Sequence, residues 1–146
     1  MRNELHSVEL KERSRRFWKE EKHLLIIDGQ VVGSFSLNFT KMTKKKLFEE
    51  YADSKSLTRI LKSFSLPNRF NYLWAETLKF YPKYRGKEFG TFSFDWIKSF
   101  PNTLIGCNSE AIDENFPVEH IVKFHQKQGL RMGKYDHEWY GFFYHR

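Results

Sequence analysis

The first forty residues pair a charged stretch with two apolar runs, a pattern that predicts a helix followed by a β-hairpin. Residues 4–21 carry sparse apolar positions in a charged background, and we interpret them as an amphipathic helix. Apolar runs follow at 24–27 and 31–37, separated by Asp28-Gly29-Gln30. Asp-Gly between apolar runs is a strong hairpin signal, because both positions tolerate a positive φ. Beyond this turn apolar and polar residues alternate, as in a half-exposed strand.

The middle of the chain predicts a helical insert, a strand and a second helix. Residues 41–66 are polar and lysine-rich, with apolar stripes at helical spacing, so we expect one or two short helices there. Aromatic and β-branched residues predict a strand over 72–80, stopped by Pro82. A basic turn at 83–90 leads into a helix over 91–99.

The last third continues the alternation of strands and helices. It predicts a strand over 103–107, a helix over 117–128 that Gly129 caps, and strands over 130–132 and 139–144. Mixed strands with helices between them predict an α/β fold in which helices flank one mixed central sheet. A chain of 146 residues suits a single domain.

The composition indicates a basic protein and a reducing environment. A net charge of +7 favours an anionic partner such as nucleic acid, an acidic protein or a phosphorylated cofactor, and a solvated basic surface explains it equally well. Cys107 is the sole cysteine, which excludes an internal disulfide and a Cys-rich zinc site, and we interpret it as a small buried strand residue. The lone thiol and the absence of a signal peptide or membrane span predict a cytoplasmic protein.

The most informative segment is a strand–turn–helix pattern at 78–91 whose turn is basic. The turn carries three cations and two glycines, namely Lys83, Arg85, Lys87, Gly86 and Gly90. Backbone N–H groups at the start of a helix, together with the helix dipole, suit an anion such as a pyrophosphate. Glycines let the backbone approach such a ligand closely. The alternative is an ordinary solvated loop.

This segment resembles the pyrophosphate loop of the GNAT superfamily of N-acetyltransferases, which reads Arg/Gln-x-x-Gly-x-Gly/Ala after a strand ending in hydrophobic-x-Pro. Arg85, Gly90 and the lead-in 78–82 fit that pattern, whereas Glu88 stands where the first glycine is usual. A carboxylate there repels a pyrophosphate unless its side chain points to solvent. The resemblance implies acetyl-CoA as the cofactor. It also implies cofactor contacts from Leu78, Phe80, Arg85, Gly86, Lys87, Phe89, Gly90 and Thr91.

A second match lies in residues 124–130, which are similar to the family's Tyr-x-x-x-Gly-Phe segment. His125 takes the place of the tyrosine that often protonates the leaving thiolate, a role that suits a histidine pKa near 6.5. Tyr135 or Tyr140 is the alternative acid, and the alternative for His125 is an exposed helical residue without a role. His120 lies five positions before His125 and so on another helical face, and we expect no metal site.

By the same resemblance, Glu76 is the general base. It stands four residues before Phe80, on the strand where some family members carry such a base. It would deprotonate an incoming ammonium, directly or through water, so that the amine can attack the thioester. A position at a sheet edge, or an ion pair with Arg69, is the alternative explanation for a carboxylate on this strand.

These features imply an N-acyltransferase that moves an acetyl group from acetyl-CoA to a primary amine by direct attack in a ternary complex. The acceptor would be a small molecule or a protein, and the insert at 41–66 would shape its site or form a homodimer contact. The alternative is a degenerate GNAT-like module that binds nucleic acid through its basic surface. Runs at 13–22 and 41–46 would then supply charge, and Phe17 and Trp18 stacking faces.

Overall fold

The computed structural model describes residues 3–12, 19–27, 29–75, 79–80, 89–109 and 117–145. The chain forms two compact units, and each is described by itself. Unit 1 comprises Met1–Thr40 and Leu73–Phe100, and unit 2 comprises Lys41–Tyr72 and Pro101–Arg146. A single domain over the whole chain stays a prediction.

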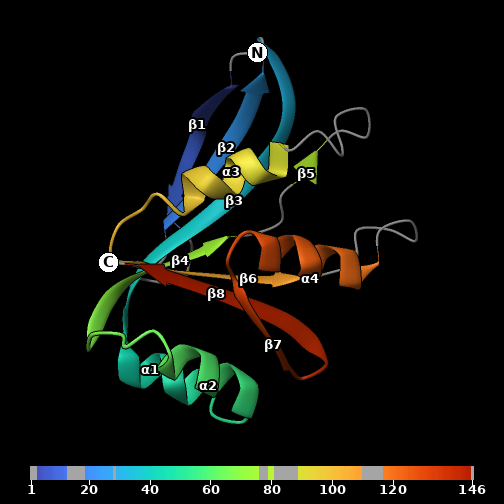
Figure 1. Ribbon diagram of the computed structural model, residues 1–146. Coiled ribbons are helices and arrows are strands. Elements are labelled where there is room, and N and C mark those ends of the chain that lie inside the picture. The colour runs from blue at the N-terminus through green and yellow to red at the C-terminus, as the bar shows by residue number, and fades with distance from the viewer. Residues whose placement is uncertain are drawn as a thin grey trace. The chain divides into compact units, whose positions relative to one another are not determined.

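Unit 1 is built on an antiparallel meander. Strands β1 (Asn3–Glu12), β2 (Lys19–Ile27) and β3 (Gln30–Thr43) pair in this order, and the short β5 (Lys79–Phe80) pairs with β3 (Figure 1). The last three residues of β3 belong to unit 2.

The helix predicted over 4–21 is wrong for the described residues, because 4–12 and 19–21 belong to two strands, and residues 13–18 lie outside the described residues. The register of β1 against β2 places Lys11 opposite Glu20 and Glu9 opposite Lys22. Residues of opposite charge at facing positions favour strand pairing. The charges that we assigned to the exposed face of a helix therefore belong to a strand pair, which local spacing alone does not reveal.

The predicted hairpin between the two apolar runs is confirmed. Gly29 has a φ of +78°, the left-handed backbone that the turn requires, and Asp28 lies outside the described residues. Along β3, Phe35 and Leu37 are buried, whereas Ser36 between them is half-buried. The alternation read from the sequence therefore holds as far as Leu37 and then breaks, because Asn38 is buried and Phe39 is half-buried.

Helix α3 (Phe89–Ile97) lies over β2 and β3 in unit 1 (Figure 1). The ring of Trp96 lies 6.1 Å from that of Phe35 and 4.9 Å from that of His23, measured between centroids. His23 in turn stacks on Phe35 at 5.3 Å. The helix predicted over 91–99 is therefore confirmed, with a start two residues earlier.

Unit 2 begins with the predicted helical insert, which forms two short helices. They are α1 (Lys44–Glu50) and α2 (Lys55–Lys62), and each starts at a hydroxyl side chain. The Oγ1 of Thr43 accepts the N–H of Lys46 at 3.2 Å, and the Oγ of Ser54 accepts the N–H of Leu57 at 3.2 Å. Such N-caps satisfy backbone donors that have no partner within the helix.

The sheet of unit 2 has the strand order β4-β6-β8-β7, of which β4 contributes its first four residues. The strands are β4 (Arg69–Ala75), β6 (Thr103–Ser109), β7 (Arg131–Tyr135) and β8 (Glu138–His145). Helix α4 (Val118–Lys127) lies on one face of this sheet, and α1 and α2 lie on the other (Figure 1). The predictions for this part of the chain are confirmed apart from small shifts of the element ends.

The strand predicted over 72–80 has different bounds in the structure. Burial alternates already from the start of β4, where Arg69 and Asn71 are exposed and Phe70 and Tyr72 are buried. The strand therefore begins at Arg69 and is described to Ala75, and β5 follows at Lys79–Phe80. Among the described residues, no helix is long and apolar enough to cross a membrane.

Candidate functional site

A buried polar cluster lies between α4 and β6 in unit 2. The Nδ1 of His125 lies 2.7 Å from the Oγ of Ser109 and 3.8 Å from the Sγ of Cys107. All three side chains are at most 7% exposed. Because side chains alternate along a strand, Cys107 and Ser109 share one face of β6, the face that α4 covers.

The end of α4 fixes the backbone of His125. The carbonyl of His125 accepts N–H groups from Gln128 and Leu130, each at 3.1 Å. Gly129 between them has a φ of +91°, which matches the expected glycine cap. The closed last turn therefore holds His125 at a defined position above β6.

The cluster is electrically neutral near pH 7. Burial lowers the pKa of His125 from 6.5 to about 4, so the imidazolium form amounts to about one molecule in a thousand at pH 7. Burial raises the pKa of the Cys107 thiol to about 12. His125 is thus a neutral, hydrogen-bonded imidazole, and the alternative of an exposed helical histidine is wrong.

The tyrosines that we considered as alternative acids lie on the opposite face of the sheet. Tyr140 pairs with Asn108 in the β6–β8 register and so faces away from Cys107 and Ser109. Its hydroxyl donates to Glu138 at 2.9 Å, and burial together with that bond raises its pKa to about 12. Tyr140 and His125 therefore lie on opposite faces of the sheet and cannot supply the acid at the same place.

Tyr140 belongs to an aromatic cluster under α1. Ring centroids of Tyr51 lie 5.7 Å from Tyr135 and 5.9 Å from Tyr140, and Tyr51 also hydrogen-bonds the buried Tyr72. Burial raises the pKa of both Tyr51 and Tyr72. These hydroxyls stay protonated, and the cluster forms the packing layer between the insert and the sheet. Sequence periodicity alone did not indicate that Tyr51 has three tyrosine neighbours.

All of the predicted cofactor and base positions belong to unit 1, and five of them lie outside the described residues. Those outside are Glu76, Leu78, Arg85, Gly86 and Lys87. The backbone of Phe80 pairs with Gly33 in the β3–β5 ladder, and Phe89, Gly90 and Thr91 form the first turn of α3. The backbone thus has a strand before the predicted loop and a helix that starts at the last two residues of that loop. Their roles stay predictions.

Metal ligands do not gather in the part of the chain that the structure describes. No three His, Cys, Asp or Glu side chains come close enough there to hold an ion. His125 and His120 are respectively buried and exposed on α4, as their five-residue separation suggested.

Solved structures resemble this fold, whereas no protein-family model and no curated protein matches the sequence. One is Arabidopsis thaliana NAA60 in complex with a bisubstrate analogue, with a TM-score of 0.54, 10% identity, and coverage of 85% of this chain and 74% of that one. Another is a mutant agmatine N-acetyltransferase in its apo form, with a TM-score of 0.51, 12% identity, and coverage of 84% and 75%.

A third is a mutant of the AtaT toxin bound to the C-terminus of the antitoxin AtaR, with a TM-score of 0.48, 12% identity and coverage of 85% of this chain. This chain spans 65% of that toxin, just under two thirds of its length. The mixed sheet flanked by helices that we predicted is confirmed by the first two of these likenesses. This protein therefore has the fold of the GNAT acetyltransferases.

Proposed function

We propose that this protein is an acetyl-CoA-dependent N-acetyltransferase that transfers the acetyl group to a primary amine by direct attack in a ternary complex. The main support is the buried, neutral His125 at the end of α4, 2.7 Å from Ser109, in a chain with the GNAT fold. A polar group held this rigidly in a dry site is the kind that active sites use to meet developing charge.

The start of α3 fits the pyrophosphate of the cofactor. The first turn of a helix has backbone N–H groups without partners inside the helix, and the helix dipole favours an anion there. No acidic residue lies in the first turn of α3. Phe89, Gly90 and Thr91 would offer these N–H groups, and Arg85, Gly86 and Lys87 would complete the loop. Leu78 and Phe80 would offer backbone groups to the pantetheine arm.

When bound, acetyl-CoA supplies an activated thioester. Glu76 would take the proton of the acceptor's ammonium, which frees the nitrogen lone pair to form the new C–N bond. With Nδ1 accepting the hydroxyl proton of Ser109, His125 would carry its own proton on Nε2 and present that N–H to the sulfur as the C–S bond breaks. Its role is then a neutral hydrogen-bond donor, because the imidazolium acid is almost absent at pH 7.

The test is a thermal-shift titration with acetyl-CoA, and with coenzyme A and ATP as controls. A ligand that binds only the folded chain at about a hundredfold excess over its Kd adds roughly 2.7 kcal/mol to the free energy of unfolding. We expect a saturable shift with both coenzyme A forms and none with ATP. Gly90→Asp should abolish the shift, whereas Ser99→Asp, which adds the same charge after the end of α3, should keep it. No shift for the wild-type chain would contradict the proposal.

The acceptor is an amine, either a small molecule or a protein. Because a structural neighbour is an agmatine N-acetyltransferase, agmatine is a rational first acceptor to assay, next to peptides with free N-termini. Release of free coenzyme A thiol that depends on the added amine would identify it. A cytoplasmic location and a homodimer stay predictions.

A further inference from the structure

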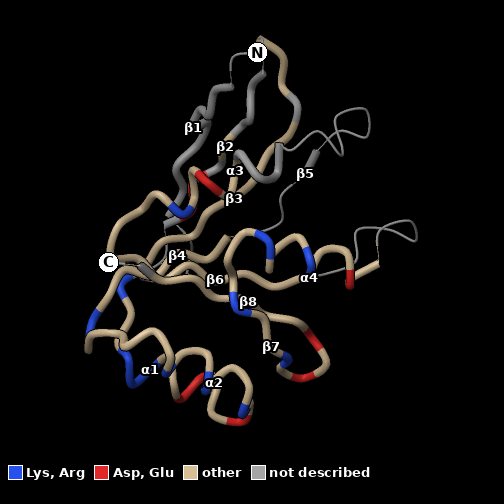
Figure 2. Tube along the Cα trace, in the orientation of Figure 1, with Lys and Arg blue, Asp and Glu red and all other residues tan. Residues whose placement is uncertain are grey.

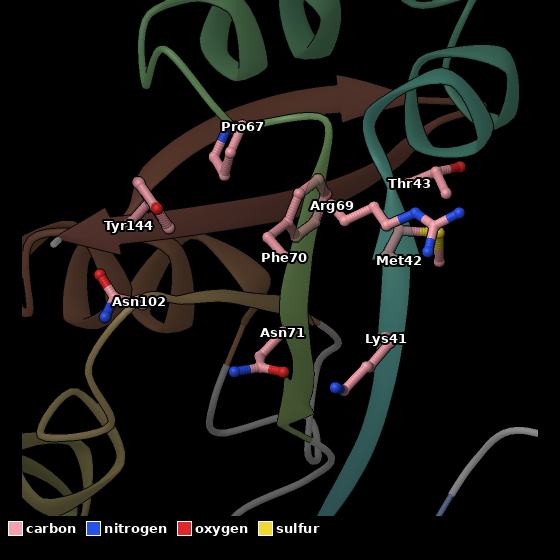
Figure 3. A pocket seen from close by; sticks show the side chains of 9 residues that line it. All are labelled: Lys41, Met42, Thr43, Pro67, Arg69, Phe70, Asn71, Asn102 and Tyr144. Atoms are coloured by element: carbon pink, nitrogen blue, oxygen red, sulfur yellow. The ribbon is translucent and has the colours of Figure 1, made fainter.

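A second candidate site lies in unit 2, where the end of β3 meets the start of β4. The N–H of Lys44 donates to the carbonyl of Asn68 at 2.9 Å and so joins the two strands there. Beside this contact is a pocket of about 640 Å³, which we call the basic pocket (Figure 3). Its polar lining comes from β3, β4, β8 and the residue before β6, and consists of Lys41, Thr43, Arg69, Asn71, Asn102 and Tyr144.

The lining of the pocket is basic. Two of its nine lining residues are cations and none is acidic. In the described part of the chain, no carboxylate lies within ion-pair distance of Arg69, which is exposed. The first turn of α1 adds three consecutive cations directly after Thr43, at Lys44, Lys45 and Lys46 (Figure 2). These three cations follow the pocket in the chain, although consecutive helical residues point in different directions, so they do not all share one face with it.

The other lining groups suit the bases of a nucleic acid. Asn71 and Asn102 are exposed amides, each with donors and an acceptor that can pair with a base edge. Tyr144 is half-buried and offers an aromatic ring. Rings of this kind stack on unpaired bases without strong sequence preference.

The shape of the pocket favours a chain over a small enclosed ligand. Burial alternates along β4, so Arg69 and Asn71 face solvent on the same side of the strand, while Phe70 between them is buried. Lys41 and Asn102 are exposed as well. Small-molecule sites enclose most of their ligand, whereas this pocket is lined by exposed side chains from two strands and a turn.

We propose that the basic pocket binds single-stranded nucleic acid. Arg69, Lys41 and the lysines of α1 would contact successive phosphates, while Tyr144 stacks on a base and the two asparagines contact base edges. Unpaired bases are required, because the stacking ring and amides reach only bases that are not already paired. This site is formed within unit 2 and does not depend on the proposed acetyl transfer.

The test is fluorescence anisotropy with a labelled mixed-sequence oligonucleotide of about 12 nucleotides, within the range that single-strand binding folds occupy. It is run with RNA and with DNA of the same sequence, at several salt concentrations. Arg69→Gln should weaken binding about tenfold at low salt, the equivalent of one charge-assisted contact. It should also reduce the slope of log K against log salt by about 0.7, the value for one phosphate contact on a single strand.

The matched control is Lys123→Gln, which removes the same charge from an exposed position of α4. It should retain wild-type affinity and slope, and Tyr144→Leu should weaken binding without changing the salt slope. Circular dichroism and melting of each variant verify that it is folded. Equal losses in Arg69→Gln and Lys123→Gln would show a diffuse charge effect and overturn the proposal. A duplex of the same sequence and inorganic phosphate are tested in the same assay. Tighter binding of the duplex than of the single strand would also overturn the proposal, as would competition by phosphate that is as effective as competition by unlabelled oligonucleotide.

Discussion

The Oγ of Ser109 lies 2.7 Å from Nδ1 of His125, between β6 and the helix that covers it. Both side chains are buried, so the bond is shielded from water and the imidazole is held in a fixed orientation. The thiol of Cys107 lies beside them, on the same face of the strand. Tyr140, on the other face, takes no part in this arrangement. The polar cluster is thus a property of one helix end and one strand, and its parts can be tested singly.

Protonation of His125 should destabilise the protein in mild acid. The pKa is about 4 in the folded chain and 6.5 in the unfolded one, so between these values the unfolded chain binds more protons. The free energy of unfolding therefore does not depend on His125 protonation above pH 6.5, and it falls as the pH drops toward 4. We expect a loss of at most about 3 kcal/mol, because one pKa unit corresponds to about 1.36 kcal/mol. Urea denaturation at a series of pH values measures it.

Two variants of α4 separate this effect from general acid sensitivity. His125→Gln keeps a hydrogen-bonding side chain but cannot titrate, so its stability should depend less on pH over this window. His120→Gln removes an exposed histidine of the same helix and should behave as the wild-type chain does. A His125→Gln profile parallel to that of the wild type would show that burial of this imidazole does not control the acid response.

Removal of the Ser109 hydroxyl should cost more than removal of an exposed one. Ser109→Ala leaves Nδ1 of His125 buried with the Cys107 Sγ at 3.8 Å in place of the 2.7 Å hydroxyl contact, and the loss of such a buried hydrogen bond costs about 1–3 kcal/mol. Ser99→Ala removes a hydroxyl that donates to the carbonyl of Trp96 on the surface, and should change stability by less than about 0.5 kcal/mol. Urea denaturation at pH 7.5 compares the two. Equal stabilities would mean that the 2.7 Å contact contributes nothing net.

The sequence predicts those elements whose signal is local. The hairpin at Gly29 depends on a backbone conformation that glycine allows, and the end of α4 depends on the same freedom at Gly129. The insert helices begin at Thr43 and Ser54, two good N-cap residues, and their apolar spacing is helical. By contrast, β1 owes its form to pairing with β2, and the charges of residues 4–21 fit a helix surface as well as a strand pair.

The candidate sites depend even more on tertiary contacts. The motif around Gly129 singled out His125, yet its burial depends on β6, whose Ser109 is 16 residues earlier. From the sequence, Arg69 was expected only as an alternative ion-pair partner for Glu76. Its place in a basic pocket follows from β3 and β4 being neighbours in the sheet order, which puts Arg69 and Lys41 in the lining of the same pocket. Spacing along a chain predicts which face a residue occupies, but not which side chains meet it there.

Cys107 should be unreactive while the protein is folded. Its Sγ is buried, and burial raises the pKa of the thiol to about 12, so almost no thiolate is present near pH 8. As the sole cysteine, it gives an unambiguous thiol count. With a disulfide reagent at pH 8, we expect negligible reaction in buffer and one thiol per chain in denaturant. Rapid reaction in buffer would contradict the burial of this side chain.

The hydroxyls of Ser54 and Ser56 share one acceptor, and this should produce a non-additive pair of variants. Both donate to the carbonyl of Lys134 in β7, at 2.8 Å and 3.2 Å. Ser54 also caps α2 through the N–H of Leu57, so Ser54→Ala should cost about 1–2 kcal/mol. Ser56→Ala should cost little, since Ser54 still satisfies the carbonyl.

The double variant Ser54→Ala and Ser56→Ala should lose more than the sum of the single losses, by about 0.5–1 kcal/mol, because the carbonyl of Lys134 then has neither hydroxyl. Thr43→Ala is the control for a helix cap whose hydroxyl does not share the carbonyl of Lys134. Its hydroxyl caps α1 on the exposed side, and its loss should be about 1 kcal/mol and additive with Ser56→Ala. Urea denaturation of the four chains completes the cycle. Strict additivity of Ser54→Ala and Ser56→Ala would show that the two hydroxyls do not substitute for one another at β7, and that Ser54 stabilises the insert through its helix cap alone.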